Sequence, residues 1–289
     1  MNVEKIIIVD GSSYIFRAFY AIRTALTNSK GLPTNAIFGF IRMLMKLIRD
    51  EKPDYVVVVF DSGKKTTRHE YFPEYKANRA SMPDDLVPQI PYIHELVRSF
   101  NIEAVCIDGV EADDIIGTLA VQSKQKGLEV TIVSGDKDMM QLVEDGVTIL
   151  DTMKDKRLGP NEVREKLGVD PDKVVEIMGL MGDSSDNIPG VPGIGPKTAL
   201  ELINTYGDIE NVLVHAHDVK KKSVREKLSQ FKDKARLSKR LVTIVTNLDL
   251  DYDLENFKVK EMNYEALVRI LKELEFTSLL KELAPPRVS

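Results

Sequence analysis

The first 150 residues alternate between short apolar, β-branched runs and longer amphipathic stretches. The apolar runs lie at residues 5–10, 54–61, 103–108, 129–136 and 146–150. Between them lie stretches such as residues 35–52, in which apolar residues recur at helical spacing. Strand runs that are apolar throughout and separated by helices are typical of a parallel sheet covered on both faces. The pattern therefore predicts an α/β fold, with a parallel sheet flanked by helices.

The pattern changes near residue 160, after which we expect only helices and turns. Helical periodicity is found at residues 159–169, 172–183, 196–207, 220–240 and 262–276. The chain contains no repeat of fixed length and no low-complexity linker. We therefore expect an α/β core over residues 1–168 and an all-helical lobe over residues 169–289.

Composition narrows the class of protein. With 289 residues and 43% hydrophobic content, the chain can bury one large core or two modest ones. The net charge of -5 gives no general attraction to nucleic acid, so such a partner needs a local basic patch. The single cysteine, Cys106, excludes an internal disulfide and is predicted to be a buried core residue. Because no apolar run has the length of a signal peptide or membrane span, we expect a cytoplasmic protein with no membrane contact.

Acidic residues gather where the predicted strands end and where a later helix ends. These residues are Asp10, Asp61, Glu111, Asp113, Asp114, Asp136, Asp138, Asp183 and Asp186. In an open parallel sheet, ligands bind beyond the carboxyl ends of the strands, so these side chains should converge. Like charges in one cleft repel each other unless cations lie between them. All-oxygen ligation suits magnesium or manganese.

The competing interpretation is that these acids are helix caps and turn formers. This interpretation explains any single acid. A helix cap needs only one carboxylate, however, and more than one is supplied by each of "EADD", "GDKD" and "GDSSD". Two close divalent ions can activate water and neutralise a leaving oxygen. We therefore predict metal-dependent phosphodiester hydrolysis without a covalent intermediate.

Two basic segments of the first half have an open interpretation. In "DGSSYIFRAFYAI", Ser12 or Ser13 is expected to cap a helix, and Arg17 is either a surface arginine or a phosphate clamp beside Asp10. Residues 64–79 interleave basic and aromatic side chains, which can grip a single strand and stack bases, although a solvated loop is the alternative. The side chains concerned are Lys64, Lys65, Arg68, Lys76, Arg79, Tyr71, Phe72 and Tyr75.

Two features of the second half point to duplex DNA. In "GVPGIGPKTALELI", Pro196 separates the last glycine from Lys197 and so excludes a Walker loop. Two helices joined by a glycine hairpin can hold a phosphate on free N–H groups, with Lys197 assisting; a plain helix-helix turn is the alternative. Residues 220–240 hold ten basic and two acidic residues. This run, which begins with Lys220, Lys221 and Lys222, is either a solvated helix face or the required basic patch.

The ordered motifs "VDGSSYIFRAFYA", "FDSGKKTTRHEYFPEYKANR", "GVEADDIIGTLA", "VSGDKDMMQL" and "MGDSSDNIPGVPGIGPKTA" resemble the flap endonuclease family. They are most similar to the 5′ nuclease (5′-3′ exonuclease) domain of bacterial DNA polymerase I, which has a PIN-like core. The resemblance covers nearly the whole chain. It implies one metal held by Asp10, Asp61, Glu111 and Asp113. A second metal is implied at Asp113, Asp136, Asp138 and Asp186, with Asp114 and Asp183 in an outer shell.

The resemblance also implies how DNA is held. A helical arch around residues 64–90 would handle the unpaired 5′ strand through Tyr75, Lys76 and Arg79, with Arg68 nearby and with Arg17 and Lys76 assisting catalysis. A helix-hairpin-helix at about 174–206 would bind duplex backbone and a potassium ion. The hairpin residues concerned are Gly190, Gly193, Gly195 and Lys197.

The implied function is removal of primers and 5′ flaps from DNA during replication and repair, with two Mg²⁺ or Mn²⁺ ions. The prolines that follow the last helix are compatible with a native tail or with a chain cut from a longer polymerase. We expect a monomer joined to a C-terminal polymerase region, although free-standing relatives are also similar.

Three other classes of protein compete with the nuclease interpretation. A haloacid-dehalogenase-like phosphatase needs a second aspartate two positions after the first, where this chain has Ser12. A non-catalytic DNA-binding module would have no need of the carboxylates. An RNA-cleaving PIN protein stays open, although such proteins are usually small and lack the helical lobe.

Overall fold

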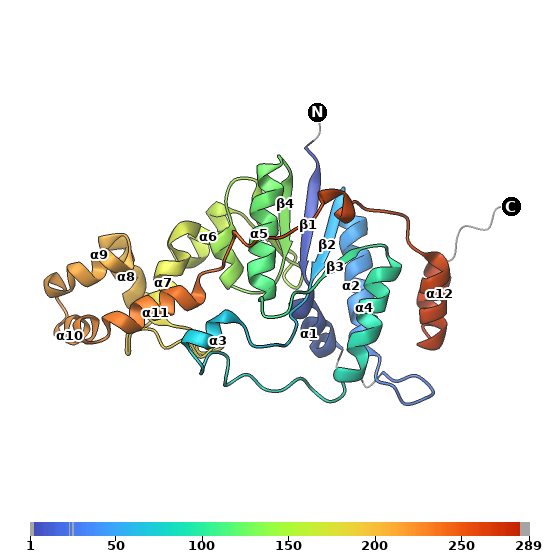
Figure 1. The fold of residues 1–289 in the computed structure, drawn as a ribbon, viewed down its shortest axis with the longest axis horizontal. Coiled ribbons are helices and arrows are strands. Elements are labelled where there is room, and N and C mark those ends of the chain that lie inside the picture. The colour runs from blue at the N-terminus through green and yellow to red at the C-terminus, as the bar shows by residue number, and fades with distance from the viewer. Residues whose placement is uncertain (1–2, 23, 25, 284–289) are drawn as a thin grey trace.

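The computed structural model describes residues 3–22, 24 and 26–283. At its centre is a six-stranded sheet in the order β3-β2-β1-β4-β5-β6 (Figure 1). The strands are β1 (Lys5–Asp10), β2 (Tyr55–Val59), β3 (Glu103–Val105), β4 (Glu129–Val133), β5 (Val147–Asp151) and β6 (Lys156–Leu158). Strands β1 to β5 are parallel, and β6 runs antiparallel beside β5. The predicted α/β class is confirmed, whereas β6 was missed because it has only three residues, two of them basic.

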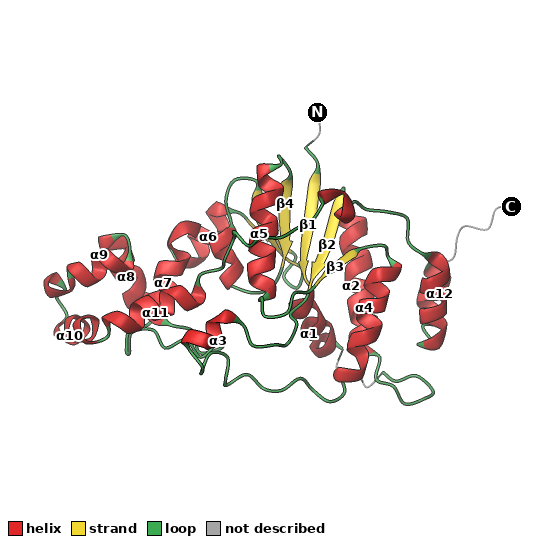
Figure 2. Cartoon of the chain, viewed as in Figure 1, coloured by secondary structure: helices red, strands yellow, loops and turns green. Residues whose placement is uncertain are grey.

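Helices cover both faces of the sheet, as Figure 2 shows. The even positions of β1, Ile6 and Ile8, pack in one core with α5 (Ala112–Gln125). The odd positions, Ile7 and Val9, pack in a second core with helices of the other face. Those helices are α1 (Gly11–Ala21), α2 (Asn35–Glu51) and α4 (Ile90–Ser99). Burial of both faces explains why the strands are apolar throughout instead of alternating.

The second half is helical, and no strand is assigned among its described residues. Its helices are α6 (Pro160–Leu167), α7 (Val174–Met181), α8 (Pro196–Tyr206), α9 (Ile209–Val214), α10 (Lys222–Gln230), α11 (Lys232–Val242), α12 (Tyr264–Glu273) and α13 (Thr277–Glu282). Short 3₁₀ turns are η1 (Val87–Gln89), η2 (Asp138–Leu142), η3 (Pro171–Lys173), η4 (Ala216–Asp218) and η5 (Leu254–Phe257). Helices α7 to α11 build a separate small core at one end of the molecule (Figure 1).

The last two helices lie with the α/β core and not with the helical lobe. After α11 the chain runs back along the core, and α12 lies at the opposite end of the molecule (Figure 1). Leu267 of α12 and Leu279 of α13 belong to the same core as α2 and α4. The lobe expected over residues 169–289 is therefore limited in space to α7 through α11. Pro285 and Pro286, which suggested a helix stop, lie outside the described residues.

The segment expected as a helical arch, residues 64–90, is helical only in part. It contains α3 (Thr67–Tyr71) and η1, with turns and irregular backbone between them. Pro73, Pro83 and Pro88 interrupt it. Proline lacks the backbone donor that an α-helix needs, so a long helix cannot form here.

Cys106 is exposed, so its prediction as a core residue is wrong. The reason is that β3 ends at Val105, and Cys106 already lies in the loop that follows. Within the described part of the chain, no helix has the length and apolar character needed to cross a membrane.

Candidate metal centre and nucleic-acid interface

The carboxylate of Asp10 lies where β1 passes directly into α1. Its Oδ1 accepts a hydrogen bond from the Ser13 N–H at 2.9 Å, and its Oδ2 accepts one from the Ser134 hydroxyl at 2.7 Å. Asp10 is thus the helix cap, and the prediction that Ser12 or Ser13 caps α1 is wrong. Ser12 instead accepts a hydrogen bond from the Asp61 N–H at 2.9 Å, which ties the ends of β1 and β2 together.

The neighbouring strand and helix ends bring further acids to this edge. Asp61 Oδ1 accepts from the Ala112 N–H at 2.9 Å, at the N-terminus of α5. Glu111 occupies the N-cap position of α5, and Asp113 lies in its first turn, where the helix dipole favours negative charge. After β4, Asp136 Oδ1 accepts from the Asp138 N–H at 2.9 Å. The expected convergence at the carboxyl edge of the sheet is thus found for these acids.

Three carboxylates of this edge have raised pKa values and form no ion pair among the described residues, although Lys76 and Lys137 offset part of the rise at Asp113 and Asp138. Burial, reinforced by Asp61 and Asp136, raises the pKa of Asp10 from 3.8 to about 6. Burial and the charge of Asp136 raise the pKa of Asp138 to about 8. The pKa of Asp113 is also raised well above its usual range, by burial and by Asp10 and Asp136. Desolvation and like charge both disfavour ionisation, so this part of the cleft is poised to attract cations.

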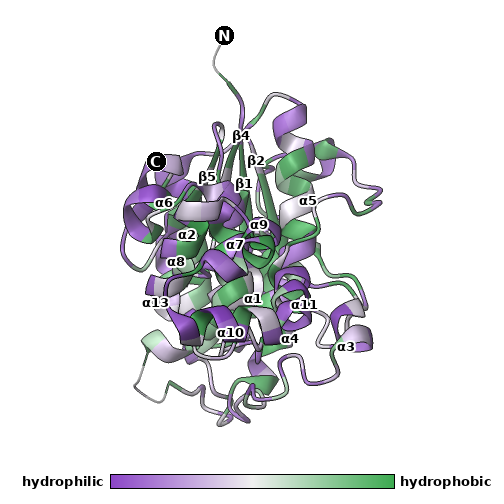
Figure 3. Ribbon diagram, turned by 90° about the vertical axis from the view of Figure 1, so that its left-hand side faces the viewer, coloured by the Kyte–Doolittle hydropathy of each residue, from purple (hydrophilic) through white to green (hydrophobic). Residues whose placement is uncertain are grey.

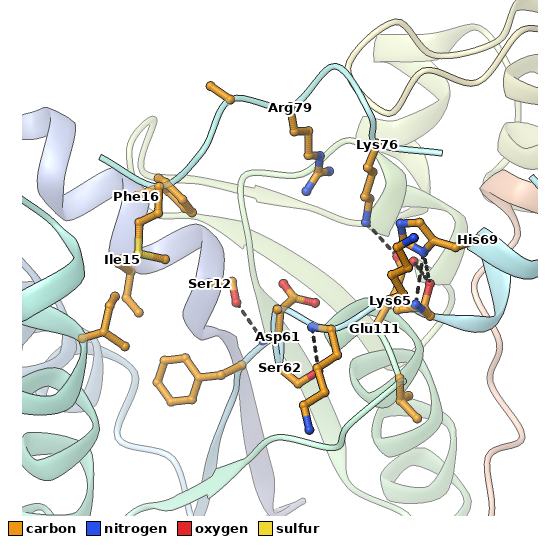
Figure 4. A pocket seen from close by; sticks show the side chains of 18 of the residues that line it. Ser12, Ile15, Phe16, Asp61, Ser62, Lys65, His69, Lys76, Arg79 and Glu111 are labelled. Atoms are coloured by element: carbon orange, nitrogen blue, oxygen red, sulfur yellow. Dashed lines mark hydrogen bonds and ion pairs between the residues drawn. The ribbon is translucent and has the colours of Figure 1, made fainter. Parts of the chain in front are cut away.

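Glu111, Asp186 and Asp183 are paired with basic side chains of the protein. Lys76 Nζ lies 2.8 Å from Glu111 Oε2 and 3.8 Å from Asp186 Oδ2. Arg79 Nε donates to Asp186 Oδ1 at 3.0 Å, and Lys137 Nζ lies 3.0 Å from Asp183 Oδ1. Figure 4 shows Lys76 and Arg79 pointing from the segment above the cleft toward Glu111 and Asp61.

Lys76 also affects the ionisation of its partner. Although burial alone would raise it, the pKa of Glu111 is lowered, because the positive charges of Lys76 and Arg68 outweigh burial. Glu111 is therefore held as a carboxylate by the protein itself.

The two predicted ligand sets are not closed around a metal position. Among the described residues, no three His, Cys, Asp or Glu side chains stand at metal-ligand spacing. Glu111, Asp186 and Asp183 are instead paired with Lys76, Arg79 and Lys137.

The donor chemistry nevertheless fits a hard divalent cation. The edge offers only carboxylate oxygens, and Asp138 Oδ1 is buried without a hydrogen-bond partner among the described residues. The raised pKa values of Asp10, Asp113 and Asp138 indicate that positive charge is needed at the same place.

Arg68 does not form the exposed DNA contact that was predicted, and its partner is Asp114. Arg68 is 4% exposed and makes a two-pronged ion pair with Asp114, with Nη1 to Oδ2 at 2.6 Å and Nη2 to Oδ1 at 2.8 Å. Asp114 also accepts from the Val245 N–H at 2.8 Å. Because Arg68 is buried, it cannot contact DNA from this position. Asp114 was expected in the outer shell and not as a direct ligand, and its oxygens are occupied by these donors.

Tyr75 and Arg17 also differ from expectation. Tyr75 is 4% exposed, and its hydroxyl donates to Glu111 Oε2 at 3.1 Å, so its ring is not free to stack on a base. Arg17 is not a surface arginine, since its side chain is only 7% exposed, and its guanidinium lies against Gly135, beside the acids that follow β4. Its guanidinium lies 3.5 Å from Asp151 and donates to the Thr152 hydroxyl at 2.6 Å, which links α1 to the end of β5.

A cavity of about 540 Å³ opens beside the carboxylates, between α1, α4 and the segment that carries Lys76 and Arg79. One wall is apolar and aromatic, with Phe16, Phe60 and His94. The other is basic and acidic, as Figure 4 shows from close by. The side chains of this second wall include Asp61, Lys64, Lys65, His69, Lys76, Arg79 and Glu111. Basic and aromatic groups face each other across a space that suits an unpaired nucleotide.

The glycine hairpin joins α7 to α8, and the loop that carries Asp183 and Asp186 leads into it. Gly190 has φ +58°, and a Cβ there would lie 2.4 Å from the Gly182 nitrogen, so only glycine fits. Pro196 is the first residue of α8 and follows Gly195 at the N-cap, as predicted.

Basic residues line the outside of this lobe. Lys197, Lys220, Lys221 and Lys222 are exposed. The ribbons of α10 and α11 are purple, for hydrophilic residues, over much of their length in Figure 3. Lys227 was missed: a Cβ on Gly193 would lie 2.1 Å from its Nζ, so this ammonium lies against the hairpin. The implied potassium ion therefore fits poorly, because Lys227 already brings positive charge to Gly193.

Other site residues were also missed. The Thr66 hydroxyl donates to Glu111 Oε1 at 2.8 Å, and Ser134 and Lys137 bond Asp10 and Asp183. Ser134 and Lys137 could have been noticed because they border the "GDKD" acids in sequence. Thr66 had no such signal, since Glu111 lies 45 residues further along the chain.

Comparison with known proteins agrees with this geometry. Residues 5–168 match the 5′-3′ exonuclease N-terminal resolvase-like domain, and residues 169–265 match the 5′-3′ exonuclease C-terminal SAM fold. The chain belongs to the 5′-3′ exonuclease family. A free-standing 5′-3′ exonuclease of Aquifex aeolicus is 42% identical over 97% of this chain and 96% of its own length. Family membership makes the chain a nuclease.

Longer relatives contain the same region. DNA polymerase I of Bacillus subtilis is 43% identical over 97% of this chain but only 32% of its own length, and that of Rhizobium leguminosarum is 43% identical over 97% and 28%. This exonuclease thus spans about a third of the length of these polymerases.

Solved structures show the same fold. A zinc-bound T5 5′-exonuclease aligns with TM-score 0.74 at 22% identity, over 94% of this chain and 99% of that chain. A bacteriophage T5 flap endonuclease with DNA and metal ions aligns with TM-score 0.71 at 24% identity, over 96% and 98%. The catalytic core of Rad2 with DNA substrate aligns with TM-score 0.64 at 19% identity, over 94% and 88%.

Proposed function

We propose that this exonuclease hydrolyses DNA at the border between a duplex and an unpaired 5′ strand, as a 5′-3′ exonuclease and 5′ flap endonuclease. The observation that carries the proposal is the position of the carboxylates between two different surfaces. On one side is the cavity with basic and aromatic walls. On the other, the Asp183 to Asp186 loop leads into the glycine hairpin and its exposed Lys197. The first surface suits an unpaired strand and the second suits duplex backbone.

The proposed cofactors are two Mg²⁺ or Mn²⁺ ions. One would be held by Asp10, Asp61, Glu111 and Asp113, and the other by Asp113, Asp136, Asp138 and Asp186, with Asp183 beyond them. Such ions activate a water molecule and neutralise the leaving oxygen when they are bound. Oxygen-only donors, the unpartnered Asp138 Oδ1 and the raised pKa values of Asp10 and Asp138 support this assignment.

The protein's own residues would position the substrate. Lys76 and Arg79 lie over the carboxylates and can hold a phosphate of the cleaved strand, because both are charged donors. Phe16, which is 38% exposed on α1, offers an apolar surface to a base in the cavity. Lys197 and the exposed Lys220, Lys221 and Lys222 would hold the duplex through its phosphates.

We further propose a cytoplasmic monomer that removes primers and flaps during replication and repair. The polymerase relatives support a covalent link to a polymerase region, and the Aquifex relative supports the free-standing alternative.

The test is the initial cleavage rate on four substrates of matched length: a DNA 5′ flap, a blunt DNA duplex, a DNA single strand and an RNA hairpin. In magnesium the flap should be cut fastest and near its base, and EDTA should abolish cleavage. The blunt duplex should be slower because unpairing its end costs a few kcal/mol. Fastest cleavage of the RNA hairpin, or equal rates on all four substrates, would refute the proposal and favour a ribonuclease.

A further inference from the structure

The buried side chain of Arg68 joins three segments that are far apart in the sequence. It belongs to α3 and forms an ion pair with Asp114 of α5. Its Nε also donates to the Leu241 carbonyl at 2.9 Å, and its Nη2 donates to the Thr243 carbonyl at 2.8 Å. Asp114 in turn accepts from the Val245 N–H at 2.8 Å. The segment above the cleft, the α/β core and the end of α11 therefore meet at one guanidinium.

The same end of α11 is tied to the glycine hairpin. The hydroxyl of Ser238, which is fully buried, accepts from the Gly190 N–H at 2.9 Å. One residue later, Lys239 Nζ lies 2.6 Å from Glu176 Oε1 of α7. The distance along the helix from Ser238 to Leu241 is only about one turn. A shift of the hairpin against the core would thus move the carbonyls that Arg68 holds.

Arg68 is also tied to the cleft itself. Its Nη1 lies 3.6 Å from Glu111 Oε1, and the preceding Thr66 donates to the same oxygen. At the other end of α3, the Arg240 guanidinium of α11 lies 3.9 Å from the centre of the Tyr71 ring. The chain then continues to Lys76, so the placement of α3 sets the placement of the basic residues over the carboxylates.

We propose that Arg68 is a positioning residue that couples duplex binding at the hairpin to the placement of residues 66–86 over the cleft. The inference rests on the proposed function, because it requires that the helical lobe bind a duplex. Its consequence is that an unpaired strand is cut efficiently only beside a bound duplex. The alternative is a purely structural ion pair. Buried ion pairs often add little net stability compared with apolar residues of similar volume, so stability alone is a weak reason for this one.

The direct test is hydrogen exchange of the backbone amides of residues 72–86, with and without a blunt DNA duplex, in calcium. The variants are Arg68→Met and Asp114→Asn. Asp114→Asn is the milder change because it keeps the side-chain shape, and it replaces Arg68→Met in the test if that variant fails to fold. Arg157→Met is the matched control, because Arg157 bonds Thr131, Thr148 and Glu51 around the edge strand β6.

We expect the duplex to slow exchange at least tenfold in the wild type and in Arg157→Met. In Arg68→Met and Asp114→Asn, the duplex should slow exchange less than twofold. Their affinity for the duplex should nevertheless stay within threefold of the wild type. Equal protection in all four proteins would overturn the proposal.

A kinetic readout separates positioning from stability. The ratio of flap to single-strand cleavage rates should fall at least tenfold in both variants, through kcat and not KM, whereas a structural role would lower Tm and leave this ratio unchanged. Failure of the wild type to cut a flap in magnesium would refute the proposed function, while the exchange experiment would still decide the role of Arg68. Failure of the wild type to bind duplex would contradict both.

Discussion

Replacement of Asp10 by asparagine tests whether the strand-end carboxylates repel each other in the metal-free protein. Asparagine has the same shape and can still accept from the Ser13 N–H, so the cap of α1 is retained. The change removes a negative charge that is 5% exposed and lies near Asp61 and Asp136. We therefore expect metal-free Asp10→Asn to be more stable than the wild type at neutral pH.

The magnitude follows from the pKa of Asp10, which burial raises from 3.8 to about 6. Each pH unit between the unfolded and folded values corresponds to about 1.4 kcal/mol, which gives about 3 kcal/mol. Since the folded state binds the proton more tightly, wild-type stability should fall as pH rises from about 4 to above 6. The variant should lack this contribution, which corresponds to a Tm difference of roughly 5–10 °C for a chain of this size.

The assay is thermal unfolding in EDTA at pH 4.5 and pH 8. Asp145→Asn, a substitution of an exposed aspartate, is the control for a charge removed elsewhere. Asp10→Asn should melt clearly higher than both other proteins at pH 8, and the difference should be about a third as large at pH 4.5, because the unfolded carboxyl is already mostly ionised there. Magnesium should then raise the wild-type Tm more than that of the variant, because a ligand that binds only the folded state stabilises it by mass action. An equal Tm difference at both pH values, or none at pH 8, would refute the reasoning.

Three further predictions concern the division of roles. Asp113→Asn should bind duplex in calcium within about twofold of wild type but lose cleavage in magnesium, measured on one flap substrate; equal loss of both activities would contradict its assignment to the metal site. Lys197→Ala should weaken duplex binding and reduce the slope of log K against log salt by about 0.9, and an unchanged slope would remove this phosphate contact. Gly190→Ala should destabilise the hairpin by more than about 1 kcal/mol, because its φ is +58° and a Cβ would strike backbone, whereas Gly195→Ala, with open space around the added Cβ, should be tolerated in the same unfolding assay.

The parallel sheet could be predicted because its strands are buried on both faces and are therefore apolar throughout. Strand β6 could not, because Lys156 and Arg157 are exposed and only Leu158 is buried. The position of α12 and α13 was also beyond prediction. Their apolar faces indicate helices that need a partner, but not that the partner lies on α2 and α4 at the start of the chain.

The acids of the site could be predicted from the sequence, whereas the burial of the residues that contact them could not. Acids at the ends of parallel strands meet at one edge whatever the side-chain details. Arg68 and Tyr75, in contrast, belong to a segment whose basic and aromatic composition suggested an exposed DNA surface. Both are buried because Asp114 and Glu111 lie against them, and these partners are 46 and 36 residues away in sequence. Pairing over such distances leaves no local pattern.

The carboxylates of the cleft fall into two groups that differ in how their negative charge is compensated. Glu111 and Asp186 are neutralised by Lys76 and Arg79, whereas Asp10 and Asp138 form no ion pair among the described residues. Hydrogen bonds to Asp10 and the charge of Lys137 near Asp138 offset only part of the effect of burial and like charge, so both pKa values are raised. Because Lys76 and Arg79 are also the cations nearest to where a DNA strand would pass, a phosphate entering the cleft competes with Glu111 and Asp186 for the same donors. Binding of the strand would therefore release these two carboxylates. The basic residues can thus stabilise the free protein and hold substrate without a separate set of charges for each task.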